Sequence, residues 1–230
     1  MILECLDISY RYPNTETPVF DGLTFAIDTP GFHSLFGPSG AGKTSLAKII
    51  TGGIKDFSGE VRSDTAAAFL YTYNLERLPD WSHVGKHLEK ITPPHQQELL
   101  GSLVALFGIQ EFLASRFSQL SLGQKNRVNL IRYLVQDFEL LILDESLANV
   151  DEKTRERIIL AIKERFEDKC FLYISHNVSE IARFCDTIVV LRTMDKQPRL
   201  IRLSGRNQTT GSAPDGITLS NTMLEIMNAV

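Results

Sequence analysis

Cysteine is scarce in this chain of 230 residues, and the three that occur indicate no cross-link. Cys5, Cys170 and Cys185 are odd in number, lie far apart and form no Cys-x-x-Cys pair. Neither a disulfide framework nor a cysteine-based zinc site is therefore indicated. We expect free thiols in a reducing cytosol.

Excess positive charge and long apolar runs are also missing. The formal net charge is -4, whereas a broad phosphate-binding face normally needs a basic surface, so we expect no nucleic-acid partner. Small phosphate ligands remain open. No apolar run approaches the roughly 20 residues of a membrane-spanning helix, and the acidic N-terminus MILECLDISY lacks the basic region of a signal peptide. We expect any membrane role to come through a partner.

The hydrophobic content of 43% is enough to bury a core. Short continuous apolar runs, which are typical of strands buried on both faces of a parallel sheet, occur at residues 32–36, 66–71, 140–143, 170–175 and 187–191. Helical patterns lie between them. In the pattern over 151–166, one face carries Ile158, Ile159, Ile162 and Phe166. The alternation predicts an α/β fold.

Residues 81–119 break this alternation, because they contain helical patterns and no strand run. We interpret them as an inserted helical subdomain. The stretch 205–216, GRNQTTGSAPDG, has the polar composition of a linker and precedes a helical pattern. The predicted organisation has three parts: a core of residues 1–80 and 120–204, the subdomain 81–119 and a linker with a C-terminal helix, 205–230.

Residues 37–44 read GPSGAGKT, which matches the phosphate-loop pattern G-x-x-x-x-G-K-[ST] between a strand run and a helix. The glycines let backbone N–H groups face a triphosphate at a helix N-terminus. Lys43 is expected to reach the outer phosphates and Thr44 to ligate magnesium. A glycine turn without a ligand is the alternative. The predicted nucleotide-binding residues here are Gly37, Pro38, Ser39, Gly40, Ala41, Gly42, Lys43, Thr44 and Ser45.

Two carboxylates, Asp144 and Glu145, follow the buried run FELLIL. Beside a phosphate loop, Asp144 is expected to hold magnesium through water, and Glu145 to polarise the water that attacks the terminal phosphate. His176 ends another buried run and could donate to that phosphate. The alternatives are a strand that ends in solvent and a surface histidine. The predicted catalytic residues are Lys43, Glu145 and His176.

These motifs, together with LSLGQ at 120–124, resemble the nucleotide-binding subunits of ABC transporters over about residues 1 to 195. LSLGQKNRV is similar to the family's signature sequence, with Leu122 where a glycine is usual, and LLILDES is similar to its Walker B strand. NVD, which ends at Asp151, resembles the loop that crosses to the other subunit. His176 matches the family's switch histidine.

The resemblance implies a phosphate-loop ATPase core, in which a mostly parallel sheet has an antiparallel β edge and an inserted helical subdomain. It also implies a head-to-tail dimer around two ATP molecules, in which Ser121, Gly123 and Gln124 contact the nucleotide held by the other subunit. Tyr12 matches the aromatic residue that stacks on adenine; a strand-end tyrosine is the alternative. Ser121 could also simply cap its helix, and both roles can hold together.

One departure from the family concerns the glutamine expected after the run 66–71, which ligates magnesium and senses the membrane partner. Thr72, Tyr73 and Asn74 stand there, and only Asn74 keeps a side-chain amide. Asn74 is therefore the third predicted metal ligand, beside Thr44 and Asp144. Nearby, Arg127 and Arg132 are expected to be surface or ion-paired residues.

The resemblance implies an ATPase subunit that uses ATP and Mg²⁺ and drives a separate transmembrane permease. It would dock through the helical subdomain and the loop between Asn74 and Trp81, from the cytoplasmic side on the inner face of the membrane. RLPDW at 77–81 is similar to the RLLPW of nitrate, sulfonate and taurine importer ATPases, which favours import of a small solute. The expected partners are an identical or different ATPase subunit, permease subunits and a solute-binding protein.

Two other functions remain open. A soluble ABC-type ATPase of iron-sulfur cluster assembly, or of another non-transport process, fits the same motifs. Repair members carry long coiled-coil insertions and translation members carry two cassettes, and this chain has neither. The second open function is a regulatory subunit that binds nucleotide without hydrolysing it. The presence of the predicted catalytic residues Glu145 and His176 counts against this function.

Overall fold

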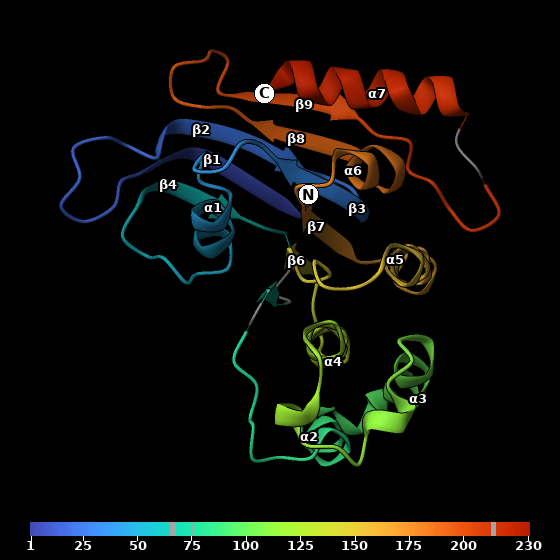
Figure 1. Ribbon diagram of the computed structural model, residues 1–230. Coiled ribbons are helices and arrows are strands. Elements are labelled where there is room, and N and C mark those ends of the chain that lie inside the picture. Colours follow the sequence, from blue (N-terminus) through green and yellow to red (C-terminus); the bar gives the residue numbers. More distant parts are fainter. Residues whose placement is uncertain (65–67, 75, 213–214) are drawn as a thin grey trace.

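The computed structural model describes residues 1–64, 68–74, 76–212 and 215–230 and contains a six-stranded sheet at its centre (Figure 1). Five neighbouring strands are parallel and the last is antiparallel. In spatial order they are β5 (Phe69–Tyr73), β6 (Leu140–Asp144), β7 (Cys170–Ile174), β3 (Gly31–Phe36), β8 (Thr187–Leu191) and β9 (Leu200–Ser204). Each predicted apolar run falls in one of the parallel strands, although Ala66 and Ala67 lie outside the described residues. The predicted α/β class is confirmed.

A second sheet is antiparallel, with β1 (Leu3–Tyr10) between β2 (Phe20–Ile27) and β4 (Ser58–Arg62). It supplies the antiparallel part that the family resemblance implies. In β1 and β2, buried positions are interrupted by partly or fully exposed ones, so their sequences contain no continuous apolar run. Helix α1 (Lys43–Ile50) fills the space between the two sheets, where Leu46, Ile49 and Ile50 are buried. This packing fixes the N-terminus of α1 beside the end of β3.

Three helices pack on the other face of the large sheet: α5 (Glu152–Arg165), α6 (Val178–Phe184) and α7 (Gly216–Ala229). The face predicted for residues 151–166 is buried, since Ile158, Ile159, Ile162 and Phe166 all lie in the core. At the C-terminus α7 lies along α6 and β9 (Figure 1). The paired helices α6 and α7 thus cover the end of the sheet that β8 and β9 form.

The stretch before α7 is held more firmly than its polar composition suggests. The backbone N–H groups of residues 205–208 donate to carbonyls of residues 182–186, at 2.7–3.0 Å. Lys163 Nζ donates to the Phe184 and Gln208 carbonyls and to Asn207 Oδ1. Residues 205–208 are therefore fixed to α6, while Ala213 and Pro214 of the expected linker lie outside the described residues.

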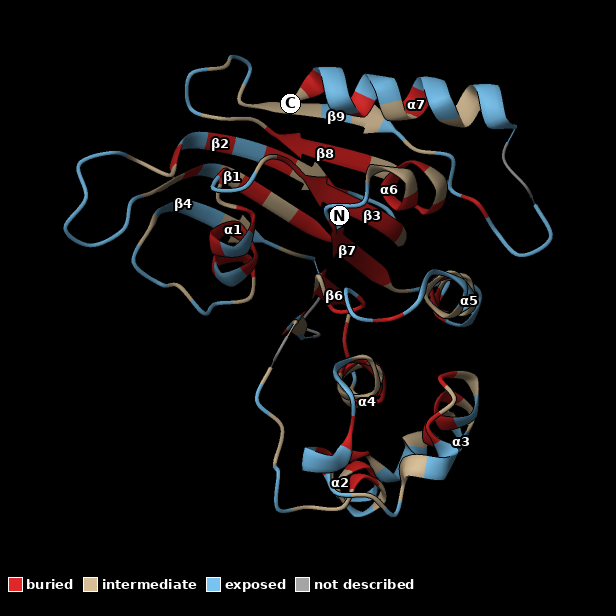
Figure 2. Ribbon diagram, viewed as in Figure 1, coloured by how far each residue is buried: buried red, intermediate tan, exposed pale blue. Residues whose placement is uncertain are grey.

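Helices α2 (Val84–Ile91), α3 (Gln97–Leu106) and α4 (Leu122–Leu134) lie below the sheets in the view of Figure 1. Residues 81–119, all of them described, contain no named strand and three short 3₁₀ turns: Pro94–Gln96, Gln110–Phe112 and Phe117–Gln119. The buried sides of α2, α3 and α4 face one another (Figure 2). The division into a core and a subdomain stays a prediction. Among the described residues, no helix is long and apolar enough to cross a membrane.

Candidate nucleotide-binding site

The phosphate loop connects β3 to α1, and its backbone requires glycine. Gly37 and Gly42 have φ values of 154° and 103°, a region that side-chain-bearing residues rarely adopt. A Cβ on Gly37 would lie 2.1 Å from the Leu191 carbonyl oxygen, and one on Gly42 would lie 2.6 Å from Val19 Cγ1. Without those side chains the loop closes tightly over the N-terminus of α1, where free N–H groups favour an anion.

Lys43, the first residue of α1, buries its ammonium group under this loop. Its Nζ donates to the carbonyls of Gly37 at 2.7 Å and Pro38 at 3.0 Å. Burial lowers the pKa of Lys43, and the nearby carboxylates of Asp144 and Glu145 partly oppose that shift. Among the described residues its hydrogen-bond partners are main-chain carbonyls, so a negative ligand would be its first direct ionic partner.

Thr44 and Asp144 meet at the carboxyl end of β6, where Thr44 Oγ1 donates to Asp144 Oδ2 at 2.9 Å. The same oxygen accepts a second bond, 2.8 Å, from the hydroxyl of Tyr71 on the neighbouring strand β5. Burial and the Asp144 charge raise the pKa of Tyr71, so the phenol stays a donor. The sequence analysis missed Tyr71, although its place in β5, the strand parallel to β6, could have revealed it.

The donors around Asp144 suit magnesium, because a hydroxyl and a carboxylate are hard oxygen ligands. No cluster of three or more metal-binding His, Cys, Asp or Glu side chains occurs in the described part of the chain. An ion held by Thr44 and Asp144 would therefore complete its shell with water and ligand oxygens, which is how Mg²⁺ is usually bound beside phosphates.

Glu145 and His176 lie at the carboxyl ends of the adjacent strands β6 and β7. His176 Nε2 lies 2.7 Å from Glu145 Oε1, and both side chains are partly exposed. Glu145 has a φ of 51°, which is uncommon for a residue other than glycine and is often found at functional sites. The two groups thus face the space in front of the phosphate loop together.

One cavity of about 320 Å³ collects most of the predicted site. Tyr12 stands at its edge with its hydroxyl 2.6 Å from Ser45 Oγ, and its ring meets the Tyr10 ring edge-on. Val19, which the sequence analysis missed, also lines the cavity. The predicted residues that line it are Tyr12, Ser39, Gly40, Gly42, Lys43, Thr44, Ser45, Asp144, Glu145 and His176.

The LSLGQ stretch does not line this cavity. Ser121 caps α4, since its Oγ accepts from the N–H of Gln124 and Gln124 Oε1 accepts from the N–H of Ser121. A Cβ on Gly123 would lie 2.3 Å from the Asn149 carbonyl oxygen, so the α4 N-terminus packs on the loop that leads to Asp151. The capping alternative is confirmed, and contact with a second subunit stays a prediction.

Asn74 is also outside the cavity. Its Oδ1 accepts bonds from the amides of Asn126 and Asn149, both 3.0 Å, and its N–H donates to the Asp144 carbonyl. A metal-ligand role for Asn74 stays a prediction. Arg132 is ion-paired with Glu76, as expected. The expectation for Arg127 was wrong, because this side chain is half-buried and its guanidinium donates to the carbonyls that follow α3.

The loop, the buried lysine and the paired carboxylates define a phosphate-loop nucleotide-binding protein. More narrowly, the chain belongs to the ABC transporter family, whose model matches residues 20–148. Membership of this family supports ATP binding by the chain.

The similar proteins are named as import ATP-binding proteins. The chain is 33% identical to the molybdenum import ATP-binding protein ModC of Saccharophagus degradans over 72% of its own length and 51% of the relative. It is 30% identical to the taurine import ATP-binding protein TauB of Pseudomonas putida, covering 83% and 78%. The spermidine/putrescine protein PotA of Borreliella afzelii is 28% identical, covering 83% and 60%. The chain thus spans about half the length of ModC and 60% of PotA.

Two solved structures share the fold. One is a bacterial Atm1-family ABC exporter with ATP bound, with a TM-score of 0.73 and 22% identity over 84% of this chain and 38% of that chain. The other is a metal-chelate-type ABC transporter in an inward-facing conformation, with a TM-score of 0.73 and 14% identity over 90% and 84%. They support the fold of an ABC ATPase.

Proposed function

We propose that this chain is the ATP-binding and ATP-hydrolysing subunit of an ABC transporter that imports a small solute through a separate permease. The observation that carries the proposal is the single cavity that joins Lys43, the Thr44–Asp144 pair and the Glu145–His176 pair. The proposal of import, rather than export, rests on relatives named for molybdenum, taurine and spermidine/putrescine import. These names do not favour the non-transport alternative.

Each group in the cavity has a separate task in phosphoryl transfer. The Lys43 ammonium neutralises the outer phosphates, and the N-terminus of α1 adds its N–H groups. Thr44 and Asp144 would hold Mg²⁺, which supplies further charge neutralisation on phosphate oxygens. The Glu145 carboxylate orients the attacking water and accepts a proton from it. His176 holds that carboxylate in place through their 2.7 Å contact.

The free N-terminus of α4 supports a dimer. Ser121 is exposed and Leu122 is half-exposed, so the capped end of this helix faces outward. A helix N-terminus favours an anion. In a head-to-tail pair, Ser121, Gly123 and Gln124 of each subunit would meet the triphosphate held by the other. Identical and non-identical pairs fit equally.

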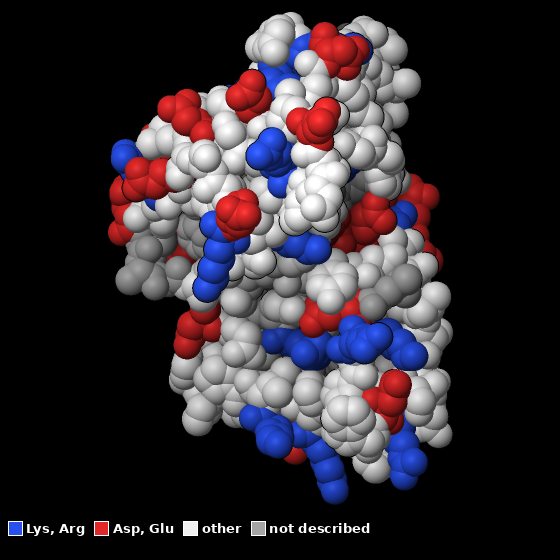
Figure 3. Space-filling model, turned by 90° about the vertical axis from the view of Figure 1, so that its left-hand side faces the viewer, with Lys and Arg blue, Asp and Glu red and all other residues white. Residues whose placement is uncertain are grey.

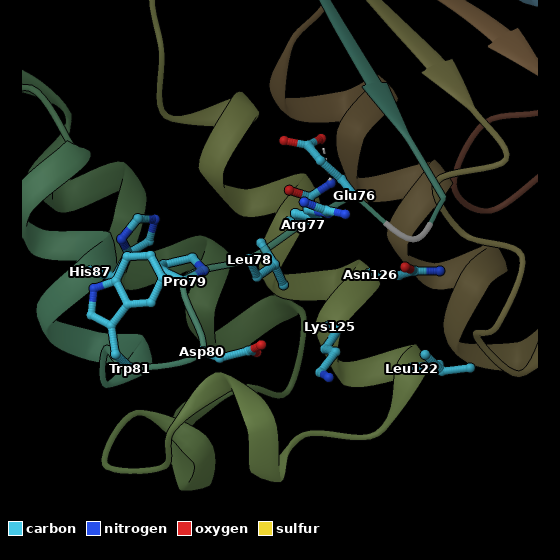
Figure 4. A pocket seen from close by; sticks show the side chains of 11 residues that line it. Glu76, Arg77, Leu78, Pro79, Asp80, Trp81, His87, Leu122, Lys125 and Asn126 are labelled. Atoms are coloured by element: carbon cyan, nitrogen blue, oxygen red, sulfur yellow. Dashed lines mark hydrogen bonds between the residues drawn. The ribbon is translucent and has the colours of Figure 1, made fainter.

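A second cavity, of about 760 Å³, offers a surface for the permease. The segment 76–81, α2 and α4 enclose it, and in Figure 4 Trp81 and His87 lie on one side of the view and Lys125 on the other. Trp81 is 83% exposed, an unusual position for an isolated tryptophan. In Figure 3, Lys and Arg side chains form a row at the height of α4, so the helical part carries much of the positive charge of this face. A permease segment with apolar and acidic side chains would fit this surface, on the cytoplasmic side of the membrane.

The experiment that tests the proposal has two arms. Purified chain is titrated with ATP and Mg²⁺ by calorimetry, and phosphate release is followed; we expect both binding and turnover. A tagged chain is then expressed in its native cells and isolated from detergent-solubilised membranes, where an integral membrane protein should accompany it. ATP turnover without that membrane protein would favour the soluble alternative, and no ATP binding would overturn the proposal.

A further inference from the structure

A network of side chains runs from the wall of the larger cavity toward the nucleotide site, and it begins at Glu76. The Glu76 side chain is 13% exposed although it lines the cavity. Its carboxylate accepts the Tyr133 hydroxyl at 2.9 Å, an Asn129 amide N–H at 3.0 Å and an Arg132 N–H at 3.4 Å. All three donors come from α4, so Glu76 fastens the segment 76–81 to that helix.

Asn129 is the next member of the network and is almost fully buried. Its Nδ2 donates to Glu76 Oε2 and to Thr72 Oγ1, both at 3.0 Å. Its Oδ1 accepts a 2.6 Å bond from Arg132. Both amide protons and the amide oxygen are therefore in use, and a buried amide that loses one partner pays the desolvation cost of that group. A movement of Glu76 would consequently shift Asn129 and change its hydrogen bond to Thr72.

Thr72 brings the network to the carboxylates of the nucleotide site. It is fully buried in β5, and its carbonyl accepts a 3.1 Å bond from Ser146 Oγ, directly after Glu145. Its neighbour in β5, Tyr71, donates to Asp144 Oδ2. The end of β5 therefore touches Asp144 and the residue after Glu145 at once.

We propose that Glu76 is a positioning residue that couples the larger cavity to the nucleotide site through Asn129 and Thr72. The inference rests on the proposed function and identifies side chains that regulate the site. Asn74 is the one residue of the stretch 72–74 that keeps a side-chain amide, and its side-chain oxygen is already committed to Asn126 and Asn149. The Glu76 carboxylate instead ties the cavity wall to the strand that carries Tyr71 and Thr72. Coupling of this kind is reciprocal, so nucleotide binding must also change the environment of the segment 76–81.

Trp81 makes this change measurable, because it is the one tryptophan in the sequence and stands in that segment. The full chain is saturated with Mg²⁺ and a non-hydrolysable ATP analogue, with saturation verified by calorimetry. Acrylamide quenching of Trp81 fluorescence is then compared with and without the analogue. We expect the analogue to change quenching in the wild-type protein and this response to be lost in Glu76→Gln and in Thr72→Val.

Thr72→Val separates coupling from a merely structural role. Among the described residues, Thr72 makes no hydrogen bond to the segment 76–81, and its side chain is linked to Glu76 through Asn129. Valine keeps the shape of threonine and suits a strand. In this variant, quenching without nucleotide should therefore equal that of the wild type, and only the nucleotide response should disappear. Asp80→Asn is the matched control: it removes a carboxylate from the same segment, and Asp80 is exposed with no hydrogen bond or ion pair in the described structure. It should keep the response.

The outcomes distinguish this inference from the proposed function. Analogue binding without a Trp81 response in the wild type would overturn the coupling and leave ATP binding intact. A response that persists in Glu76→Gln or in Thr72→Val, with melting curves showing folded protein, would overturn the route through Asn129. No analogue binding to the wild type would overturn both proposals.

Discussion

His176 Nε2 lies 2.7 Å from Glu145 Oε1, across the carboxyl ends of two neighbouring parallel strands. Parallel strands end at the same edge of a sheet, so residues 31 positions apart in the chain meet there. The contact restrains a carboxylate that is one-third exposed. It restrains the direction of the Glu145 carboxylate in the cavity, as the proposed role of general base requires.

The Glu145→Gln variant should bind ATP but hydrolyse it slowly. Glutamine keeps the size and can still contact His176, whereas the group that accepts the proton of the attacking water is lost; loss of general base catalysis typically costs about 10²- to 10⁴-fold. Stable dimers should therefore accumulate with ATP and Mg²⁺, measured by light scattering. Monomer alone, in a sample that binds ATP, would contradict the dimer around two nucleotides.

The Lys43→Ala variant should lose almost all hydrolysis. The buried ammonium group is the fixed positive charge nearest the loop carbonyls, and removal of one such stabilising group typically costs about 10²- to 10³-fold in rate. Lys48→Ala is the matched control, because Lys48 lies on the same helix and is exposed. Phosphate release should be near wild type in Lys48→Ala; equal losses in both variants would contradict the site.

Glu180 should contribute strongly to stability because its buried carboxylate accepts three hydrogen bonds and forms an ion pair with Arg155. Tyr173 and Asn177 donate to it at 2.8 and 2.9 Å, a Ser175 bond is longer, and Arg155 Nε lies 2.6 Å away. Breaking such a buried pair leaves Arg155 uncompensated, so Glu180→Gln should lower the free energy of unfolding by roughly 3 kcal/mol.

Urea unfolding at constant pH measures this loss, with Glu156→Gln as the control. Glu156 also pairs with an arginine, Arg183, but its side chain is one-third exposed, and pairs of this kind contribute about 0–1 kcal/mol. Similar losses in both variants would show that burial of the Glu180 pair has no special weight. Ser175 and Asn177 flank His176, so a reduced ATPase rate in folded Glu180→Gln would indicate that the network also positions the histidine.

The sequence could predict the phosphate loop and both strand-end carboxylates because each depends on local pattern. Glycine spacing, a preceding apolar run and a following helix specify Lys43 and Thr44 without knowledge of distant contacts. Tyr71 and Glu76 could not be found this way. Their partners, Asp144 and Tyr133, lie more than 50 residues away in the chain, and only the pairing of β5 with β6 and the packing of α4 bring them together.

Stability should fall as the pH rises above about 9, because buried thiols resist ionisation in the folded protein. Burial raises the pKa of Cys5 and of Cys170 to about 12, and raises that of Cys185. In the unfolded chain these thiols lose protons near pH 8.5, so the folded state then binds more protons and each thiol removes up to about 1.4 kcal/mol of stability per pH unit. The contribution is complete below the unfolded pKa and is lost as pH rises toward the folded value.

Lys163 acts in the opposite direction and only partly offsets this decline. Burial lowers its pKa to about 8, so between there and its unfolded value of 10.5 the unfolded chain binds the extra proton and stability rises. Burial lowers the pKa of Lys43 as well, and three thiols still outweigh two lysines. The urea concentration at the unfolding midpoint should therefore be lower near pH 10 than near pH 8.5. A variant with Cys5, Cys170 and Cys185 all replaced by alanine should show a smaller fall; an equal fall would assign the alkaline instability to other groups.

Mixed dimers test whether Ser121 serves the ATP of the other subunit, if the chain pairs with itself. Lys43→Ala and Ser121→Arg proteins should each be inactive alone. In a mixed dimer, one site takes Lys43 from the Ser121→Arg chain and Ser121 from the Lys43→Ala chain, and is therefore complete. Because one missing phosphate donor costs about 10²- to 10³-fold, partial recovery should exceed the background.

Recovery of ATP-dependent dimerisation is the more direct measurement in these mixtures, since the two sites of a dimer need not turn over independently. A mixture of Lys43→Ala with Lys125→Ala provides the control, because Lys125 also lies in the first turns of α4 but in the wall of the larger cavity. If mass measurements show mixed dimers of Lys43→Ala and Ser121→Arg, yet neither dimerisation nor hydrolysis recovers, then LSLGQ acts within its own chain. The stretch would then serve only to cap the N-terminus of α4, through the two hydrogen bonds between Ser121 and Gln124.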